Sequence, residues 1–201
     1  MNQRNVYELF PDPIFHYKLE NYKQINKELL NYILELQKKD KKGNNRSNRG
    51  GWHSPNFDIV NPGPPIDFIN SFKVFLKNII EDEIGWEYVP NKQRIVAMWA
   101  IINKKNSYNV KHNHQNCYLS SAYYIKKPEN SGDITFHDPK EAKTYRFPEV
   151  EKYTSYSEQS ITIKPKEGDL LIFPSYLYHD VGINLSDEER VVVSFNIDIG
   201  Y

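Results

Sequence analysis

Hydrophobic positions in the first part of the chain recur at helical spacing. Apolar residues return every three or four positions from about residue 22 to residue 39, which predicts an amphipathic helix. A second apolar face follows Asp67 and ends near Gly85. We expect Asp67 to cap this second helix, because an aspartate can accept hydrogen bonds from the free N–H groups of the first turn.

Residues 40–51, between these two helices, are the most polar stretch of the chain. The stretch contains no apolar side chain that could anchor it to a core, so we expect a mobile loop.

Beyond about residue 94 the pattern changes to short apolar runs separated by turn residues. The runs cover residues 94–102, 119–125, 132–136, 160–163, 169–173 and 190–197. Repeated short strands are typical of a β-sandwich or barrel. We therefore predict a mainly β fold with flanking α-helices. A single domain over residues 1–201 is expected, with a helical part (about 1–90) that supports a β-core (about 94–198).

Composition limits the kinds of partner that this chain is expected to have. Lys and Arg total 26 and Asp and Glu total 26, so the formal net charge is zero. Neither a nucleic-acid surface nor a polybasic membrane anchor is expected. No apolar stretch approaches the roughly 20 residues that span a bilayer. The single cysteine fits a reducing compartment, so we expect a cytoplasmic protein, in the host cytoplasm if it is phage-encoded.

Three histidines are the strongest chemical signal. His112 and His114 are separated by one residue, and in a strand such side chains point to the same face. His179, on a distant segment, can complete a facial set of three ligands that leaves other metal positions open for substrate. Taken alone, the pair is also compatible with two exposed histidines in a loop. His53 lies in a Gly-Gly-Trp-His-Ser segment that could reach a pocket, although we favour a structural role for it. Trp99 is interpreted as a core residue that lines a pocket if it faces inward.

The order of these features resembles the iron(II)- and 2-oxoglutarate-dependent oxygenases, in particular small bacterial and phage enzymes related to the prolyl hydroxylases. The features are the H-x-H pair, Tyr123-Tyr124, Ser131-Gly132, the strand that ends Gly168-Asp-Leu-Leu-Ile-Phe-Pro174, His179 and Arg190. The resemblance covers about residues 94–198. It implies a double-stranded β-helix (jelly-roll, cupin-like) core with two N-terminal helices outside it. It also implies iron(II), 2-oxoglutarate as cosubstrate and O2.

The resemblance also implies roles for individual residues. His112 and His179 match metal ligands of the family, and Arg190 matches the residue that binds the far carboxylate of 2-oxoglutarate. Tyr124 matches a tyrosine that donates to the same carboxylate. Ser194 lies four residues after Arg190 on the same strand face, so its hydroxyl can join them. Asn103 is expected to position the cosubstrate or a metal-bound water.

One position departs from the family pattern, which is usually H-x-D. His114 stands where the family has the carboxylate. Three explanations are open: His114 binds the metal, Asp138 supplies a carboxylate from the end of a neighbouring strand, or only two protein ligands hold the metal. We favour a metal set of His112, His114 and His179. Asp138 is then a candidate catalytic residue beside the metal or in contact with the substrate.

The implied activity is hydroxylation of a protein side chain such as proline, of a peptide or of a small metabolite. Loops 40–56 and 139–160 are expected to shape the substrate site. The second loop is a candidate lid that contains Tyr145, Arg146, Phe147, Tyr153 and Tyr156. A homodimer is one expected assembly.

Two other classes compete with this interpretation. A cupin-like metal enzyme without 2-oxoglutarate normally has a glutamate soon after H-x-H, and residues 115–119 contain none. Such an enzyme would also leave Arg190 without a function. The other class is a non-catalytic jelly roll that binds a ligand or has a structural role.

Overall fold

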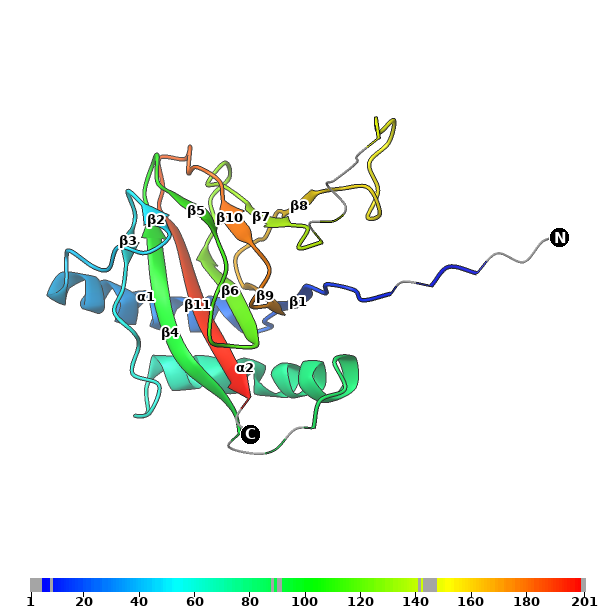
Figure 1. Cartoon of the computed structure of the whole chain (residues 1–201). Coiled ribbons are helices and arrows are strands. Elements are labelled where there is room, and N and C mark those ends of the chain that lie inside the picture. The colour runs from blue at the N-terminus through cyan, green and yellow to red at the C-terminus, as the bar shows by residue number, and fades with distance from the viewer. Residues whose placement is uncertain are drawn as a thin grey trace.

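The computed structural model describes residues 5–7, 9–87, 89, 92–140, 142 and 148–199. Two antiparallel sheets face each other, and the two long helices lie along the outside of the larger sheet (Figure 1). The six-stranded sheet has the order β1-β9-β6-β11-β4-β3, and the five-stranded sheet has the order β2-β5-β10-β7-β8. This arrangement confirms the predicted mainly β fold with flanking helices.

The elements follow one another along the chain with these bounds. They are β1 (Phe15–Lys18), α1 (Tyr22–Lys39), β2 (Asn48–Arg49), β3 (Trp52–His53), α2 (Pro64–Asn78), the π-helical turn η1 (Ile79–Glu83), β4 (Gln93–Asn103), β5 (Tyr108–His112), β6 (Leu119–Lys126), β7 (Ile134–His137), β8 (Ser160–Ile163), β9 (Asp169–Pro174), β10 (His179–Val181) and β11 (Arg190–Ile199).

The first helix has its predicted bounds, whereas the second begins earlier than expected. Helix α2 starts at Pro64, directly after Gly63 at the N-cap. Proline suits the first helical position because its fixed φ fits the helix and its missing N–H would have no partner there. The prediction that Asp67 caps the helix was therefore wrong. Asp67 lies in the first turn, where a carboxylate is favourable for the helix dipole.

The larger sheet has two chemically different faces. Tyr123 of β6 belongs to the core cluster under the helices, with Phe68 and Phe72 of α2. Its neighbour Tyr124 belongs to a second cluster, with Phe136 of β7 and Phe173 of β9. Successive side chains of a strand point to opposite faces, so one face of β6 anchors the helices and the other faces the second sheet. A site between the sheets is therefore lined by this second face, and the helices do not cover it.

Residues 40–51 are held by hydrogen bonds. We expected a mobile loop because the segment has no apolar anchor, and this reason was wrong. The buried Asn48 accepts from the Arg46 backbone N–H at 2.9 Å and donates to the carbonyls of Asn44 and Gly51. The Trp52 indole N–H donates to the Asp40 carbonyl at 2.7 Å. Asparagine side chains here replace the missing apolar anchor, because they satisfy backbone groups from within the loop.

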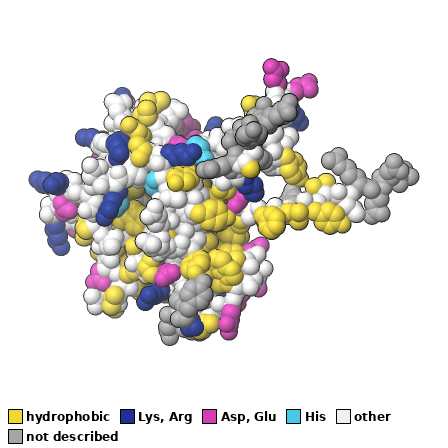
Figure 2. Space-filling model, viewed as in Figure 1, with side chains coloured by type: hydrophobic (Ala, Val, Ile, Leu, Met, Phe, Trp, Pro, Cys, Tyr) yellow, Lys and Arg dark blue, Asp and Glu magenta, His cyan; other side chains and the backbone are white. Residues whose placement is uncertain are grey.

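The surface mixes charges of both signs, and the N-terminal arm extends from the body of the protein (Figure 2). Apolar side chains along this arm are exposed, among them Val6, Tyr7, Leu9 and Phe10. No helix in the described part of the chain is long and apolar enough to cross a membrane.

A buried polar contact joins helix α1 to the larger sheet. The Tyr123 hydroxyl donates to Asn26 Oδ1 at 2.6 Å, and Asn26 Nδ2 donates to the Ile125 carbonyl at 2.9 Å. Both groups are enclosed by apolar side chains, so neither has water as an alternative partner.

We predict that Asn26→Ala lowers the free energy of unfolding by about 2 to 4 kcal/mol, because it leaves a buried hydroxyl and a buried carbonyl without partners. Urea denaturation measures this loss. The control is Asn31→Ala on the exposed side of the same helix, which should change the free energy by no more than about 0.5 kcal/mol. Equal effects of the two substitutions would contradict the role of Asn26.

Candidate active site

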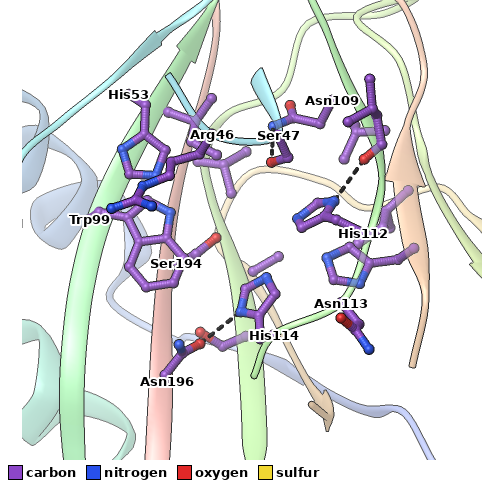
Figure 3. Close-up of a pocket in the computed structure, with 18 of the residues that line it drawn as sticks. Arg46, Ser47, His53, Trp99, Asn109, His112, Asn113, His114, Ser194 and Asn196 are labelled. Carbon is purple, nitrogen blue, oxygen red and sulfur yellow. Dashed lines mark hydrogen bonds between the residues drawn. The ribbon is translucent and has the colours of Figure 1, made fainter. Parts of the chain in front are cut away.

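A cavity of about 830 Å³ opens between the two sheets. Its walls come from β3, β4, β5, β6, β7, β9, β10 and β11 and from the segment that precedes β2, which contributes Arg46 and Ser47 (Figure 3). Loop 40–56 therefore shapes the cavity as expected, because Asn44, His53 and Asn56 also line it.

Strand pairing brings the three predicted histidines together in this cavity. His112 is the last residue of β5 and lies directly opposite His179, the first residue of β10. His114 follows just beyond the end of β5, where its backbone N–H donates to the Ser175 carbonyl at 2.9 Å. One ring nitrogen from each histidine lies within 4.8 Å of the others. The three imidazoles thus have the spacing of ligands around one metal ion.

Hydrogen bonds fix the orientation of each imidazole ring. The Nδ1 atom of His112 lies 2.7 Å from the Val110 carbonyl, and that of His179 lies 3.0 Å from the Leu177 carbonyl. His114 Nδ1 lies 2.7 Å from the side-chain oxygen of Asn196. Carbonyl oxygens only accept, so each Nδ1 donates its proton and each Nε2 keeps a free lone pair. This is the state in which histidine binds a metal.

Burial keeps the three imidazoles neutral near pH 7. Desolvation lowers the pKa of His179 to about 3 and that of His114 to about 4, and it also lowers the pKa of His112. Neutral, pre-oriented imidazoles fit a divalent transition metal such as iron(II).

Asn196 is a site residue that the sequence analysis missed. Its Oδ1 accepts from both His114 Nδ1 and the Ser120 hydroxyl, the latter at 3.1 Å. Asn196 thus positions the imidazole that replaces the carboxylate of the H-x-D pattern. The available signal was its spacing, because Arg190, Ser194 and Asn196 share one face of β11.

The side chain of Arg190 is buried at another part of the cavity wall. Its Nη1 donates to the carbonyls of Ser131, Gly132 and Gly182, the last two at 3.0 and 3.4 Å. Within the described part of the chain, no carboxylate lies within ion-pair distance of the guanidinium. A buried cation is costly without an anionic partner, so this position favours an anionic ligand.

Tyr124 and Ser194 line the same cavity as Arg190. Tyr124 is fully buried, and burial raises the pKa of its phenol, so the hydroxyl remains a donor at neutral pH. Ser194 is also buried. The sequence placed these two residues with Arg190, and the structure brings all three to one cavity.

Two predicted site residues lie outside this cavity wall. Asp138 lines a separate cavity of about 470 Å³ together with Asp12, and its Oδ1 accepts from the Lys140 backbone N–H at 2.8 Å. The structure thus does not bring Asp138 to the three histidines. Asn103 is buried one layer behind the wall, where its Nδ2 donates to Asn109 Oδ1 at 2.9 Å. Asn109 in turn donates to the Ser47 hydroxyl, and both of these residues line the cavity.

The candidate lid is only partly within the described residues. Tyr145, Arg146 and Phe147 lie outside them. Tyr153 and Tyr156 are exposed, and Tyr156 lines the separate cavity beside Asp138. Neither of these two tyrosines lines the cavity of the three histidines.

His53 and Trp99 form a wall of the histidine cavity. Their rings are nearly parallel, with centroids 5.8 Å apart, and Trp99 is tilted against His114 at 5.6 Å. His53 Nδ1 lies 2.7 Å from the Ser54 carbonyl. The structural role favoured for His53 is thus corrected in part, because its side chain lines the cavity. Trp99 faces inward, whereas its neighbour Met98 belongs to the core under the helices.

Comparison with known proteins gives one family and a set of similar folds. Residues 97–196 match the family described as "Putative 2OG-Fe(II) oxygenase". No curated protein matches the chain. A Pseudomonas putida prolyl-4-hydroxylase is similar with a TM-score of 0.67 and 10% identity, over 94% of each chain.

Two further solved structures are similar over most of their length. A prolyl hydroxylase from Trichoplax adhaerens, in complex with a peptide of hypoxia inducible factor, has a TM-score of 0.65 and 12% identity, over 92% of this chain and 83% of that chain. HygX from Streptomyces hygroscopicus, with nickel, 2-oxoglutarate and hygromycin B bound, has a TM-score of 0.63 and 9% identity, over 94% and 84%. At these identities the likeness supports the jelly-roll fold.

We predict that the metal-free protein loses stability as the pH falls from about 6.5 toward 4. An unfolded histidine titrates near pH 6.5. Below that pH the unfolded chain binds protons that the buried native His114 and His179 do not bind. Each of these groups adds up to about 1.4 kcal/mol per pH unit to the slope. Denaturation in the presence of a chelator should show a shallower slope for His179→Asn, and an unchanged slope would contradict the assignment.

Proposed function

Because this chain belongs to the 2OG-Fe(II) oxygenases, which use iron(II), 2-oxoglutarate and O2, we propose that the histidine cavity is its active site and that the enzyme is a hydroxylase. The observation that carries the proposal is the common cavity of three pre-oriented imidazoles and a buried, unpaired Arg190. Family membership disfavours the two competing classes, a cupin-like enzyme without 2-oxoglutarate and a non-catalytic jelly roll.

His112, His114 and His179 are the proposed metal ligands. When bound, iron(II) together with 2-oxoglutarate and O2 supplies the oxidising power that hydroxylates an unactivated C–H bond. The three Nε2 atoms would hold the metal, and the hydrogen bonds at Nδ1 set the orientation of their rings. Apolar side chains of the wall, among them Ala122, Phe173 and Val192, exclude water from the reacting groups.

Arg190, Tyr124 and Ser194 are the proposed binding residues for the far carboxylate of 2-oxoglutarate. Among the described residues, the hydrogen bonds of Arg190 all come from Nη1, which leaves its Nε and Nη2 donors for a ligand. A guanidinium can then hold a carboxylate in bidentate fashion. Tyr124 and Ser194 add hydroxyl donors from the same wall. Asn103 acts indirectly, through Asn109 and Ser47.

The substrate and the setting of the enzyme are further parts of the proposal. A protein side chain such as proline, a peptide or a small metabolite is the proposed substrate class. We propose an enzyme that acts in the cytoplasm without a nucleic-acid or membrane partner, which the balanced formal charge and the single cysteine support. We propose that residues 1–201 act as one catalytic domain, alone or as a homodimer.

Substitution of the proposed anchors should separate cosubstrate binding from metal binding. We predict that Arg190→Gln weakens 2-oxoglutarate binding by about tenfold to a hundredfold, because a charge-assisted hydrogen bond is lost, and that it leaves iron(II) binding unchanged. His179→Ala should lose the metal itself. Anaerobic titration of the iron(II)-loaded protein, followed by the visible band of the metal–keto acid chelate, measures both effects.

The control for this experiment is Arg94→Gln, which removes the same charge from an exposed position on β4. It should bind iron(II) and 2-oxoglutarate as the wild type does. Loss of metal binding in Arg190→Gln, with retained folding by circular dichroism, would count against the anchor role.

The third ligand can be tested by changing each candidate alone. We predict that His114→Ala weakens iron(II) binding at least about tenfold, whereas His114→Asp retains binding because a carboxylate at this position is also a suitable ligand. Asp138→Asn should leave the affinity unchanged, because Asp138 lines a different cavity. Competition with a metal indicator measures the affinities. Weakened binding in Asp138→Asn alone would assign the third ligand to Asp138.

A further inference from the structure

The wall of the histidine cavity has an uneven charge distribution. Two arginines and four histidines line it, whereas no aspartate or glutamate does so among the described residues. The three proposed metal ligands are neutral imidazoles, so the ligand set contributes no negative charge. Because the ligand set contains no carboxylate, only the cosubstrate brings negative charge to the metal.

The loaded site would keep an excess of positive charge, because iron(II), Arg190 and Arg46 together carry more positive charge than the two carboxylates of 2-oxoglutarate neutralise. In the proposed function one carboxylate of 2-oxoglutarate lies at the metal and Arg190 holds the other, so the cosubstrate has no further anionic group to offer. Arg46 remains without an assigned partner. Its side chain has no ion pair within the described part of the chain, although it is exposed and lines the cavity. Because Arg46 is both exposed to solvent and part of the cavity wall, it lies at the cavity mouth.

Arg46 and Arg190 have different neighbours. The charge of Arg46 acts on His53, and Figure 3 shows the Arg46 side chain beside the His53 ring and the Trp99 indole. The charge of Arg190 acts on Tyr124, and its Nη1 is held by backbone carbonyls of the segments around Gly132 and Gly182. The two guanidiniums are therefore suited to two separate anionic groups.

Hydrogen bonds fix the backbone of Arg46, so its exposed side chain begins at a defined position beside the cavity. Asn48 Oδ1 accepts from the Arg46 N–H, and the Arg46 carbonyl accepts from Arg49 Nη1, each at 2.9 Å. Less backbone freedom is then lost when the side chain binds a ligand.

We propose that the enzyme acts on a substrate that carries an anionic group, a carboxylate or a phosphate ester, and that Arg46 binds this group at the cavity mouth. The inference rests on the proposed function, since it assigns Arg190 to the cosubstrate. Arg46 grips the anion in bidentate fashion, while the body of the substrate lies against Trp99. His53 Nδ1 donates to the Ser54 carbonyl, so its Nε2 can accept a hydrogen bond from the substrate.

The test uses three probes on anaerobic protein loaded with iron(II) and saturated with 2-oxoglutarate. Phenyl phosphate and phenylacetate each carry an anionic group on an aromatic body, and phenylacetamide is the neutral counterpart. Calorimetry measures their dissociation constants, and the visible chelate band shows that 2-oxoglutarate stays bound throughout. We expect at least one anionic probe to bind tenfold or more tightly than phenylacetamide, which is the effect of one charge-assisted contact.

Two variants assign the preference to a residue. Arg46→Gln should abolish the preference for the anionic probe while it keeps the 2-oxoglutarate affinity of the wild type. Lys42→Gln, which removes the same charge from an exposed position outside the cavity wall, should keep the preference. Stronger binding of phenyl phosphate indicates a phosphate ester as substrate, and stronger binding of phenylacetate indicates a carboxylate.

Three results would overturn the inference: equal binding of charged and neutral probes, a preference that survives in Arg46→Gln, or loss of 2-oxoglutarate affinity in Arg46→Gln. The last result would assign Arg46 to the cosubstrate. Absence of the chelate band in the wild-type protein would instead refute the proposed function, so the two failures are distinguishable.

Discussion

The antiparallel pairing of β10 with β5 determines the geometry of the site. It places His179 directly opposite His112, so that two imidazoles from segments far apart in the chain reach the same point. Side chains alternate between faces along a strand, and a slip of one residue would therefore turn His179 away from the cavity. The pairing of β10 with β7 on its other edge, from His179↔Phe136 to Val181↔Ile134, fixes this register from the second side.

The second requirement is that the histidines stay neutral and correctly oriented in the absence of metal. Each Nδ1 has an oxygen partner, and two of these partners are backbone carbonyls that lie two residues earlier in the chain. The third, Asn196, comes from β11, which also contributes Arg190 and Ser194 to the cavity wall. Strand β11 thus supports one of the proposed metal ligands through Asn196 and also carries Arg190, the proposed carboxylate anchor. The spacing of residues along β11 therefore sets the distance between Asn196 and Arg190.

Local patterns were sufficient to predict helix α1, the strands β4, β6, β7, β8, β9 and β11, and the residues that lie on one face of a single strand. The short strands β5 and β10, which carry His112 and His179, were not among the predicted runs. Ser194 was found in this way, because period-two alternation decides which side chains share a face, whereas Tyr124 was proposed from the family resemblance. Asp138 could not be judged from sequence, since the cavity that it lines depends on how loop 139–160 and the N-terminal arm meet. Asn196 was missed because its partner His114 lies 82 residues away.

Loop 40–51 shows why a polar segment can still be part of a precise site. Its order depends on Asn48 and on the Trp52 indole, which satisfy backbone carbonyls that water would otherwise solvate. A loop held in this way needs no apolar side chains, so its remaining positions are free to carry polar and charged groups. Arg46 occupies such a position at the cavity mouth. In the proposed enzyme, strands hold the groups that bind the metal and cosubstrate, whereas a hydrogen-bonded loop holds the group that selects the substrate.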